Sequence, residues 1–419
     1  MNHVVTTLQR NYPTATEPAF LTRRVDRYYL ERVQQTWDGG HIMRGRTPGS
    51  DALHLSSNDY LSISRHPKII QAAATSLQQH GNGLLMSGIF LHGDNPLLEF
   101  ERRLGNFMEA ESGVLCQSGF AANTGLLQSI AGDCTPVYVD MMAHMSLWEG
   151  IRSAGARAVP FHHNDVESLE RQMLKHGQGI VLVDSVYSTN GSVCPLGEIA
   201  ALCCERDCVL VVDESHSLGT HGQHGEGLVA ALGLSDLVHF RTASLAKAFA
   251  GRAGFIACSA RFAEYFKFES NPAIFSSTLL GHEVAGLDAT LEVIRQEGWR
   301  RKILHENSAY LRHNLEALGY NLNGSQSQII ALESGSERQT IALRDALEEA
   351  GIFGSVFCAP ATAKNRALIR LSVNCALTEA ELNRIVGVCR DIRIRVGLAG
   401  WASTRRLRRA ASLPEAIAA

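Results

Sequence analysis

The chain has 419 residues, more than one small hydrophobic core usually holds, so we expect a large domain with a smaller one. Its 45% hydrophobic and 19% charged residues are typical of a soluble globular protein. The net charge of −3 gives no general affinity for nucleic acid or an anionic membrane, and no apolar run approaches the roughly 20 residues that span a bilayer.

Residues 1–24 mix prolines, arginines and polar residues and lack the apolar core of a secretory signal. The ten cysteines are scattered, and no cysteine or histidine pairs have the spacing of a zinc site. We therefore expect a cytoplasmic protein with reduced thiols and no metal site.

Residues 1–50 read as an N-terminal arm, in which apolar residues at helical spacing predict a helix over 20–37 that Asp38-Gly39-Gly40 ends. A short strand is predicted near residues 54–57. Helices are predicted over 67–79 and 96–108, on either side of a glycine-rich stretch at 81–88.

From residue 113 to 257, apolar runs alternate with helical segments such as 119–130 and 196–205. Because buried apolar strands alternating with helices are typical of parallel sheets, the pattern predicts an α/β fold with a mostly parallel sheet covered on both faces. Ligands of such sheets bind at the carboxyl ends of the strands. The predicted strands are 113–116, 137–139, 180–183, 209–212, 237–240 and 255–257.

A large domain is expected over 51–295, and its last helix, 283–296, is expected to lead into a small α+β domain over 296–397. Residues 398–419 form a basic tail. The small domain is expected to contain helices at 301–318, 338–350 and 379–396 and strands at 328–332 and 367–373.

Lys247 lies just after a predicted strand, with small or apolar residues on both sides. Such surroundings disfavour the ammonium form, so the pKa of Lys247 is expected to fall and its amine to become nucleophilic. Ser244, three residues earlier, is placed to hold an anionic group near that amine. A solvated lysine at a strand end is the alternative.

Asp213 comes directly after the strand at 209–212, where a carboxylate needs a partner. A protonated pyridine nitrogen is such a partner, and holding that proton makes pyridoxal 5′-phosphate (PLP) an electron sink. His216 is placed to reach the phenolic oxygen of the same ring. A structural Asp that caps the following turn explains the motif equally well.

Ser118, Gly119 and Phe120 open a helix, where free backbone N–H groups and a glycine can form a phosphate cup; a simple helix cap is the alternative. His144 follows a strand and could stack on a planar ring or be purely structural. Arg370 lies inside an apolar strand and needs an anion there, either a substrate carboxylate or a structural ion-pair partner.

Over residues 50–395 the chain resembles the α-oxoamine synthases, fold-type I PLP enzymes that join an amino acid to an acyl-CoA. Within them it is most similar to the α-hydroxyketone autoinducer synthases, on segments 90–91, 144–150, 213–222, 272–279 and 354–358. The motifs that carry the family resemblance are Asn58-Asp59-Tyr60-Leu61, Ser118-Gly119-Phe120, Ala143-His144-Met145-Ser146, Asp213-Glu214-Ser215-His216-Ser217-Leu218-Gly219, Ser244-Leu245-Ala246-Lys247 and Ile369-Arg370-Leu371-Ser372.

The resemblance implies a seven-stranded sheet in the large domain and a catalytic role for Lys247, which binds PLP covalently and moves protons. It implies that Asp213 pairs with the pyridine nitrogen and that His144 stacks on the ring. His216 and Ser188 are then expected to approach the phenolic oxygen.

The resemblance also implies that Ser118, Gly119, Phe120 and Ser244 surround the cofactor phosphate. Ser277 and Thr278 are expected to reach the phosphate of the neighbouring subunit, which implies a homodimer with shared active sites. Arg370 and Asn58 are expected to orient the substrate carboxylate.

The expected activity is a decarboxylating condensation of an acyl-CoA with an amino acid, giving a long-chain α-aminoketone, the precursor of a quorum-sensing signal. Residues 83–88 replace the family's usual Gly-Ser-Arg run, and Glu214-Ser215 stands where Asp-Ala is commoner. These departures favour a donor such as S-adenosylmethionine or 2-aminobutyrate. The apolar side chains at 84–86, 89 and 90 could line an acyl tunnel, with core packing as the alternative: Leu84, Leu85, Met86, Ile89 and Phe90.

Three other functions remain open from the sequence. One is an α-oxoamine synthase of primary metabolism, which makes 8-amino-7-oxononanoate or 2-amino-3-ketobutyrate. Another is a PLP aminotransferase on the same scaffold. The third is a catalytically silent PLP-fold binding module, which the presence of Lys247, Asp213 and His216 argues against.

Overall fold

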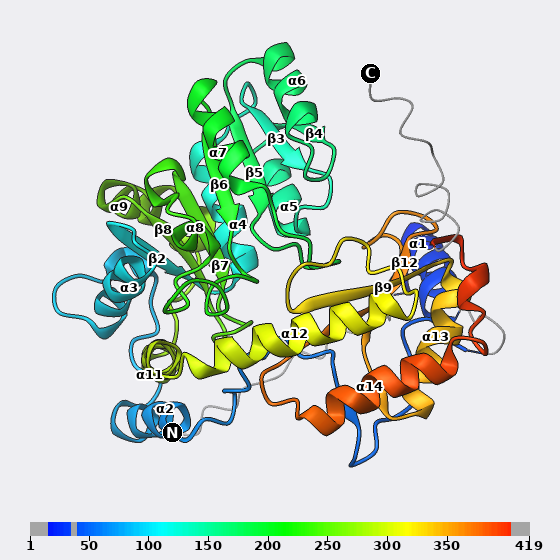
Figure 1. The fold of residues 1–419 in the computed structure, drawn as a ribbon. Helices are drawn as coiled ribbons and strands as arrows, with labels where there is room; N and C mark the ends of the chain where they lie inside the picture. Colours follow the sequence, from blue (N-terminus) through cyan, green and yellow to red (C-terminus); the bar gives the residue numbers. More distant parts are fainter. Residues whose placement is uncertain (1–15, 35–39, 404–419) are drawn as a thin grey trace, which may run out of the picture.

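The computed structural model describes residues 16–34 and 40–403. Its larger part is built on a seven-stranded sheet with the order β2-β8-β7-β6-β5-β3-β4 (Figure 1). β8 is antiparallel to both neighbours, and the other pairs are parallel, as expected. The strands are β2 (Ser112–Cys116), β3 (Pro136–Asp140), β4 (Arg157–Phe161), β5 (Ile180–Asp184), β6 (Val209–Asp213), β7 (Phe240–Ser244) and β8 (Gly254–Cys258).

Helices cover both faces of this sheet. On β5, Val181 and Val183 pack into one hydrophobic cluster, whereas Leu182 packs into another on the opposite face. The first cluster includes side chains of α6 and α7, and the second includes those of α4, α5 and α9. These helices are α4 (Gly119–Ile130), α5 (Met145–Ser153), α6 (Val166–His176), α7 (Leu196–Glu205) and α9 (Ala260–Glu269).

The smaller part contains an antiparallel sheet with the order β11-β12-β9. Helix α12 runs from the larger part along this sheet (Figure 1). A parallel pair, β1 with β10, joins an early segment of the chain to this region. These elements are β1 (Leu53–His54), β9 (Ile329–Gly335), β10 (Ile352–Phe353), β11 (Ser355–Phe357), β12 (Ala367–Ser372), α12 (Trp299–Ala317), α13 (Glu337–Glu349) and α14 (Glu379–Ile392).

Most predicted elements are found, with shifts at their ends. The helix predicted over 20–37 is split into an α-helix and a π-helical turn, and its predicted stop at Asp38-Gly39 lies outside the described residues. The remaining helices are α1 (Ala19–Tyr29), α2 (Pro67–His80), α3 (Pro96–Phe107), α8 (Leu228–Ala231), α10 (Asn271–Ile274) and α11 (Gly281–Gln296). In the parts that the structure describes, no helix is both long and apolar enough to cross a bilayer.

The strand predicted over 237–240 was wrong. Leu237 ends a short 3-10 turn, and β7 runs instead from Phe240 to Ser244, where it pairs with β6 and β8. The strand was not predicted because Arg241 interrupts its apolar pattern. Arg241 is nevertheless buried, and Glu214, 3.9 Å away, compensates its charge. The correction moves the strand end to within three residues of Lys247.

Candidate active site

A pocket of about 220 Å³ lies where the carboxyl ends of β5, β6 and β7 meet the N-terminus of α4. This is the edge of a parallel sheet at which ligands are expected to bind. The structure brings together most of the predicted site residues here, with several that were not predicted. The lining residues are Ser118, Gly119, Phe120, Asn123, His144, Ser146, Asp184, Asp213, Ser215, His216, Ser244 and Lys247.

Asp213 ends β6 and is only 5% exposed. Its Oδ1 accepts a hydrogen bond from the backbone N–H of Ser215 at 2.9 Å, and its Oδ2 accepts one from Asn123 Nδ2 at 2.8 Å. Two donors therefore fix the orientation of the carboxylate at the base of the pocket.

Asp184 ends β5 directly beside Asp213 in the sheet register. Burial, followed by the charge of Asp213, raises the pKa of Asp184 well above its ordinary value. Burial and the neighbouring charge both disfavour ionisation, so Asp184 keeps its proton to a higher pH than an exposed carboxyl group does. Asp184 also accepts the backbone N–H of His144 at 3.2 Å, which ties His144 to the sheet.

Lys247 follows β7 in a turn and is half-buried. Burial, followed by the charge of Arg370, lowers the pKa of its amine, while Asp213 opposes this shift. The sequence predicted this direction from the apolar flanks. Arg370 adds a second cause that only the fold reveals, because it comes from a distant strand.

His216 is buried, and its Nδ1 lies 2.7 Å from the hydroxyl of Tyr60. Burial, followed by the charges of Lys247 and Arg370, holds the pKa of His216 well below its ordinary value, so its imidazole is neutral. Burial also raises the pKa of Tyr60, which keeps its hydroxyl protonated. The hydroxyl of Tyr60, which also lies 3.2 Å from Asn58 Oδ1, thus hydrogen-bonds to His216 and orients its ring in the pocket.

Arg370 lies in β12 and is 7% exposed. Its Nη1 donates to the backbone oxygen of Ser188 at 2.8 Å and its Nη2 to Asn58 Oδ1 at 3.1 Å, while its guanidinium carbon lies 4.9 Å from the ring centroid of Phe357. Its Nε has no hydrogen-bond partner among the described residues. The guanidinium is therefore held in place with a donor left for an anion.

Ser118 caps α4 by accepting the backbone N–H of Ala121 at 3.1 Å. The next residue, Gly119, packs so closely that a Cβ there would lie 2.6 Å from the Cβ of Ser244. Glycine thus lets the helix start approach the segment that leads to Lys247. The first residues of α4 line the pocket, and the backbone N–H groups at a helix start suit an anion.

These residues fit PLP by the chemistry of their donors. The start of α4 suits the phosphate, the carboxylate of Asp213 suits a protonated ring nitrogen, and the amine of Lys247 suits the aldehyde. Asn58 and Arg370 contact each other at the edge of this site, as expected for a pair that orients a carboxylate.

Five predicted residues do not line this pocket in the same chain: Asn58 and Arg370, whose mutual contact is described above, and the three residues Ser188, Ser277 and Thr278. Ser188 contributes its backbone oxygen to Arg370, whereas its hydroxyl was predicted to act. Ser277 accepts a hydrogen bond from Gln117 through its backbone oxygen, and the backbone N–H of Thr278 donates to Met86. The cofactor roles of these three residues stay predictions.

The sequence reasoning missed Tyr60, Asn123, Ser146 and Asp184 as site residues. Asp184 carried the same signal as Asp213, an acid at the end of an apolar strand. Asn123 lies within an apolar helix, where an amide without a local role is a sign of a buried polar network. Tyr60 lies within the motif Asn58-Asp59-Tyr60-Leu61, but nothing local in the sequence indicates its contact with His216, which spans 156 residues.

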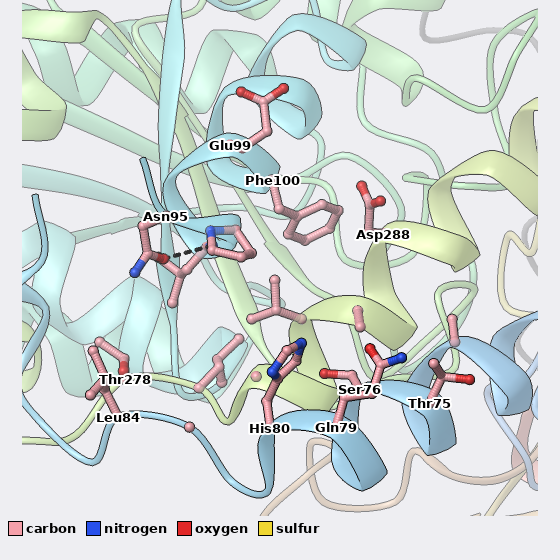
Figure 2. Close-up of a pocket in the computed structure, with 18 of the residues that line it drawn as sticks. Thr75, Ser76, Gln79, His80, Leu84, Asn95, Glu99, Phe100, Thr278 and Asp288 are labelled. Atoms are coloured by element: carbon pink, nitrogen blue, oxygen red, sulfur yellow. Dashed lines mark hydrogen bonds between the residues drawn. The ribbon is translucent and has the colours of Figure 1, made fainter. Parts of the chain in front are cut away.

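A second cavity, of about 1150 Å³, lies between α2, α3 and α11 and shares no lining residue with the Lys247 pocket (Figure 2). Phe100 and Asn95 approach it from α3 and the preceding residue, and Leu84 and Thr278 lie at one end. Of the apolar residues predicted to line a tunnel, Leu84 is among the lining residues of this cavity, whereas Leu85 and Phe90 are not. All three side chains are largely exposed.

Comparison with known proteins agrees with this geometry. Residues 50–388 match the family of class I and II aminotransferases. The chain is 46% identical over 374 residues to a CAI-1 autoinducer synthase from Vibrio campbellii, covering 89% of this chain and 95% of that protein. It is 31% identical over 351 residues to an 8-amino-7-oxononanoate synthase from Bacillus velezensis, covering 82% and 88%.

Among solved structures, a serine palmitoyltransferase from S. paucimobilis with bound PLP superposes with a TM-score of 0.83 at 25% identity. The match covers 90% of this chain and 99% of that one. An 8-amino-7-oxononanoate synthase from Francisella tularensis has a TM-score of 0.73 at 20% identity, over 83% and 99% of the two chains, and shares the fold.

Proposed function

Since the chain belongs to the class I and II aminotransferase family, and within it to the α-oxoamine synthases, we propose that it is a PLP-dependent acyltransferase that makes a long-chain α-aminoketone precursor of an autoinducer. The choice of an autoinducer synthase over a primary-metabolic synthase rests on sequence identity. The chain is 46% identical to an autoinducer synthase over 95% of that protein's length, against 31% for an 8-amino-7-oxononanoate synthase. The substrates are an acyl-CoA and a small amino acid or S-adenosylmethionine.

When bound, PLP supplies an electron sink for the pair left by a bond broken at the amino acid's Cα. Lys247 would hold the cofactor's aldehyde, and its amine, with its lowered pKa, would accept the Cα proton. Asp213 would keep the ring nitrogen protonated, because its carboxylate is fixed by two donors. His216, held neutral and next to Tyr60, would serve the phenolic oxygen.

Arg370 and Asn58 would grip the amino acid's carboxylate. By fixing the orientation of the substrate's Cα, this contact would determine which of its bonds breaks. We propose that the acyl chain lies in the cavity between α2, α3 and α11, where Leu84, Leu97 and Val284 offer an apolar lining.

We further propose a homodimer with shared sites, in which Ser277 and Thr278 of one subunit serve the phosphate of the other. Two features support this arrangement. Both residues lie outside the Lys247 pocket of their own chain, and the nearby apolar side chains Phe275 and Phe90 are 81% and 62% exposed.

The test is mass spectrometry of the product formed by purified protein from a panel of acyl-CoAs with competing amino donors. An α-aminoketone that retains the acyl chain, formed with release of free coenzyme A only when both substrates are present, is the expected result. An aminotransferase would instead release a keto acid without any thioester. A product made only from pimeloyl or acetyl thioesters would favour a primary-metabolic synthase.

A further inference from the structure

We infer that Asn123 and Ser146 are positioning residues that hold His144 in one tautomer, with its proton on Nε2, and tie this ring to Asp213. Asn123 comes from α4, Ser146 from α5 and Asp213 from β6, so the connection joins three elements of the pocket. All three side chains are at most 5% exposed. His144, the residue predicted to stack on the cofactor, lies at the open end of this connection.

The amide of Asn123 is fully used. Its Nδ2 lies 2.8 Å from Asp213 Oδ2 and 2.8 Å from Ser146 Oγ, and its Oδ1 lies 2.6 Å from the hydroxyl of Thr242. A carboxylate only accepts hydrogen bonds, so the amide nitrogen must face Asp213 and the amide oxygen must face Thr242. The two amide protons are then donated to Asp213 and to Ser146.

The donor direction of the Asn123–Ser146 hydrogen bond also sets the direction of the bond between Ser146 and His144. Because Ser146 Oγ accepts from Asn123, its own proton is free for His144 Nδ1, which lies 2.8 Å away. The backbone N–H of Ser146 also donates to this Nδ1, at 3.3 Å. With two donors directed at it, Nδ1 acts as an acceptor, and the neutral ring carries its proton on Nε2.

The consequence concerns the chemistry of the pocket. Nε2 of His144 has no hydrogen-bond partner among the described residues, while His144 itself lines the pocket beside Lys247. The fixed tautomer therefore presents an unused N–H donor to whatever occupies the site. An oxygen of the substrate, from a carboxylate or a thioester carbonyl, is the kind of group that this donor suits.

The direct test is neutron diffraction from crystals of the holoenzyme, which locates deuterium on each ring nitrogen of His144. We expect deuterium on Nε2 and none on Nδ1 in the wild-type protein. Deuterium on Nδ1 would overturn the inference, whatever product the enzyme makes. Conversely, failure to form an α-aminoketone would defeat the proposed function and leave this tautomer assignment standing.

A double-mutant cycle tests the connection kinetically. Ser146→Ala should lower kcat about tenfold with little change in KM, the size expected for one lost hydrogen bond. In an Asn123→Ala background the same change should have a smaller effect than in the wild type, because Asn123 no longer directs the Ser146 hydroxyl toward His144. Losses that simply multiply would show that the two residues act independently. Ser153→Ala, which removes a hydroxyl from the same helix bonded to Gly150, should leave kcat unchanged.

Discussion

Lys247 shows how a single residue is tuned by distant parts of the chain. Its apolar flanks are local and were visible in the sequence, whereas Arg370 arrives from a strand more than a hundred residues later. The pKa is lowered because burial and a like charge both disfavour the ammonium form. Burying this amine therefore lowers the stability of the folded protein when the cofactor is absent, and thermal unfolding can measure the effect.

In cofactor-free protein, Lys247→Met should raise the melting temperature at pH 7. At pH 7 the folded wild-type protein must either keep a charged amine buried at Lys247 or lose a proton that Lys247 retains in the unfolded chain, and both destabilise the fold. Because the folded pKa of Lys247 is lowered, this cost shrinks as the pH rises through the folded pKa and vanishes near the unfolded pKa of about 10.4. The gain should therefore disappear in melting curves at pH 10.5.

Lys302→Met is the matched control. This lysine is 77% exposed on α12, and its Nζ lies 3.9 Å from Glu306 Oε1 in a surface ion pair. It should change the melting temperature little at either pH. An equal gain for Lys247→Met at both pH values would contradict the lowered pKa.

At the scale of elements, the start of α4 is where packing and the cofactor site meet. Gly119→Ala should weaken cofactor binding at least about tenfold, because the added Cβ would lie 2.6 Å from the Cβ of Ser244 and push the helix start from the site. Equilibrium titration with PLP, followed by absorbance, measures this. Gly132→Ala, just beyond the same helix with open space around its Cβ position, should bind PLP as the wild type does.

Helix α11 offers a test of the acyl site. Ala285→Phe places a large ring in the cavity between α2, α3 and α11, and we expect KM to rise about tenfold for a long acyl-CoA. A short acyl-CoA, which would not fill the cavity, serves as the internal control and should keep its KM. An equal rise for both chain lengths would show that the substitution acts on the fold rather than on acyl binding.

The elements also show what a sequence can and cannot reveal. Runs such as 180–183 and 209–212 were recognised because strands buried on both faces are continuously apolar. β7 was misplaced because Arg241 interrupts its apolar pattern, and β4 was missed because Arg157 and two of its neighbours are exposed. In both cases sheet pairing, a tertiary property, overrides local pattern.

Some residues of the candidate site could likewise be predicted from the sequence, and others could not. Lys247, Asp213 and His216 follow strands and carry motifs that can be read in the sequence. Tyr60 and Asn123 act through contacts that span 156 and 90 residues. An amide within an apolar helix indicates that Asn123 has a buried partner, but no local pattern identifies which residue it is. The motifs thus predicted residues that the structure brings together in one pocket, while the side chains that contact them became visible only in the fold.

At the scale of the whole molecule, the position of Ser277 and Thr278 supports a dimer with shared sites. Ser277 and Thr278 are held next to residues 86–87, through the bridge between Ser87 and Ser277 and the bond from Thr278 to Met86. Neither lines the pocket of Lys247 in the same chain. A dimer with shared sites gives this segment a function, because each subunit would then complete the phosphate site of its partner.

This arrangement predicts complementation between two inactive variants. Lys247→Met removes the amine, and Ser277→Glu, at a residue outside the acyl cavity, places a negative charge against the partner's phosphate, so each homodimer should be nearly inactive. After mixing in equal amounts with subunit exchange, half of the dimers are mixed, and each holds one site with both native residues. Activity should then recover to about one quarter of the wild-type value, a ratio fixed by the twofold symmetry. If each subunit instead builds its site alone, every site retains one defect, and the mixture stays as inactive as its parts.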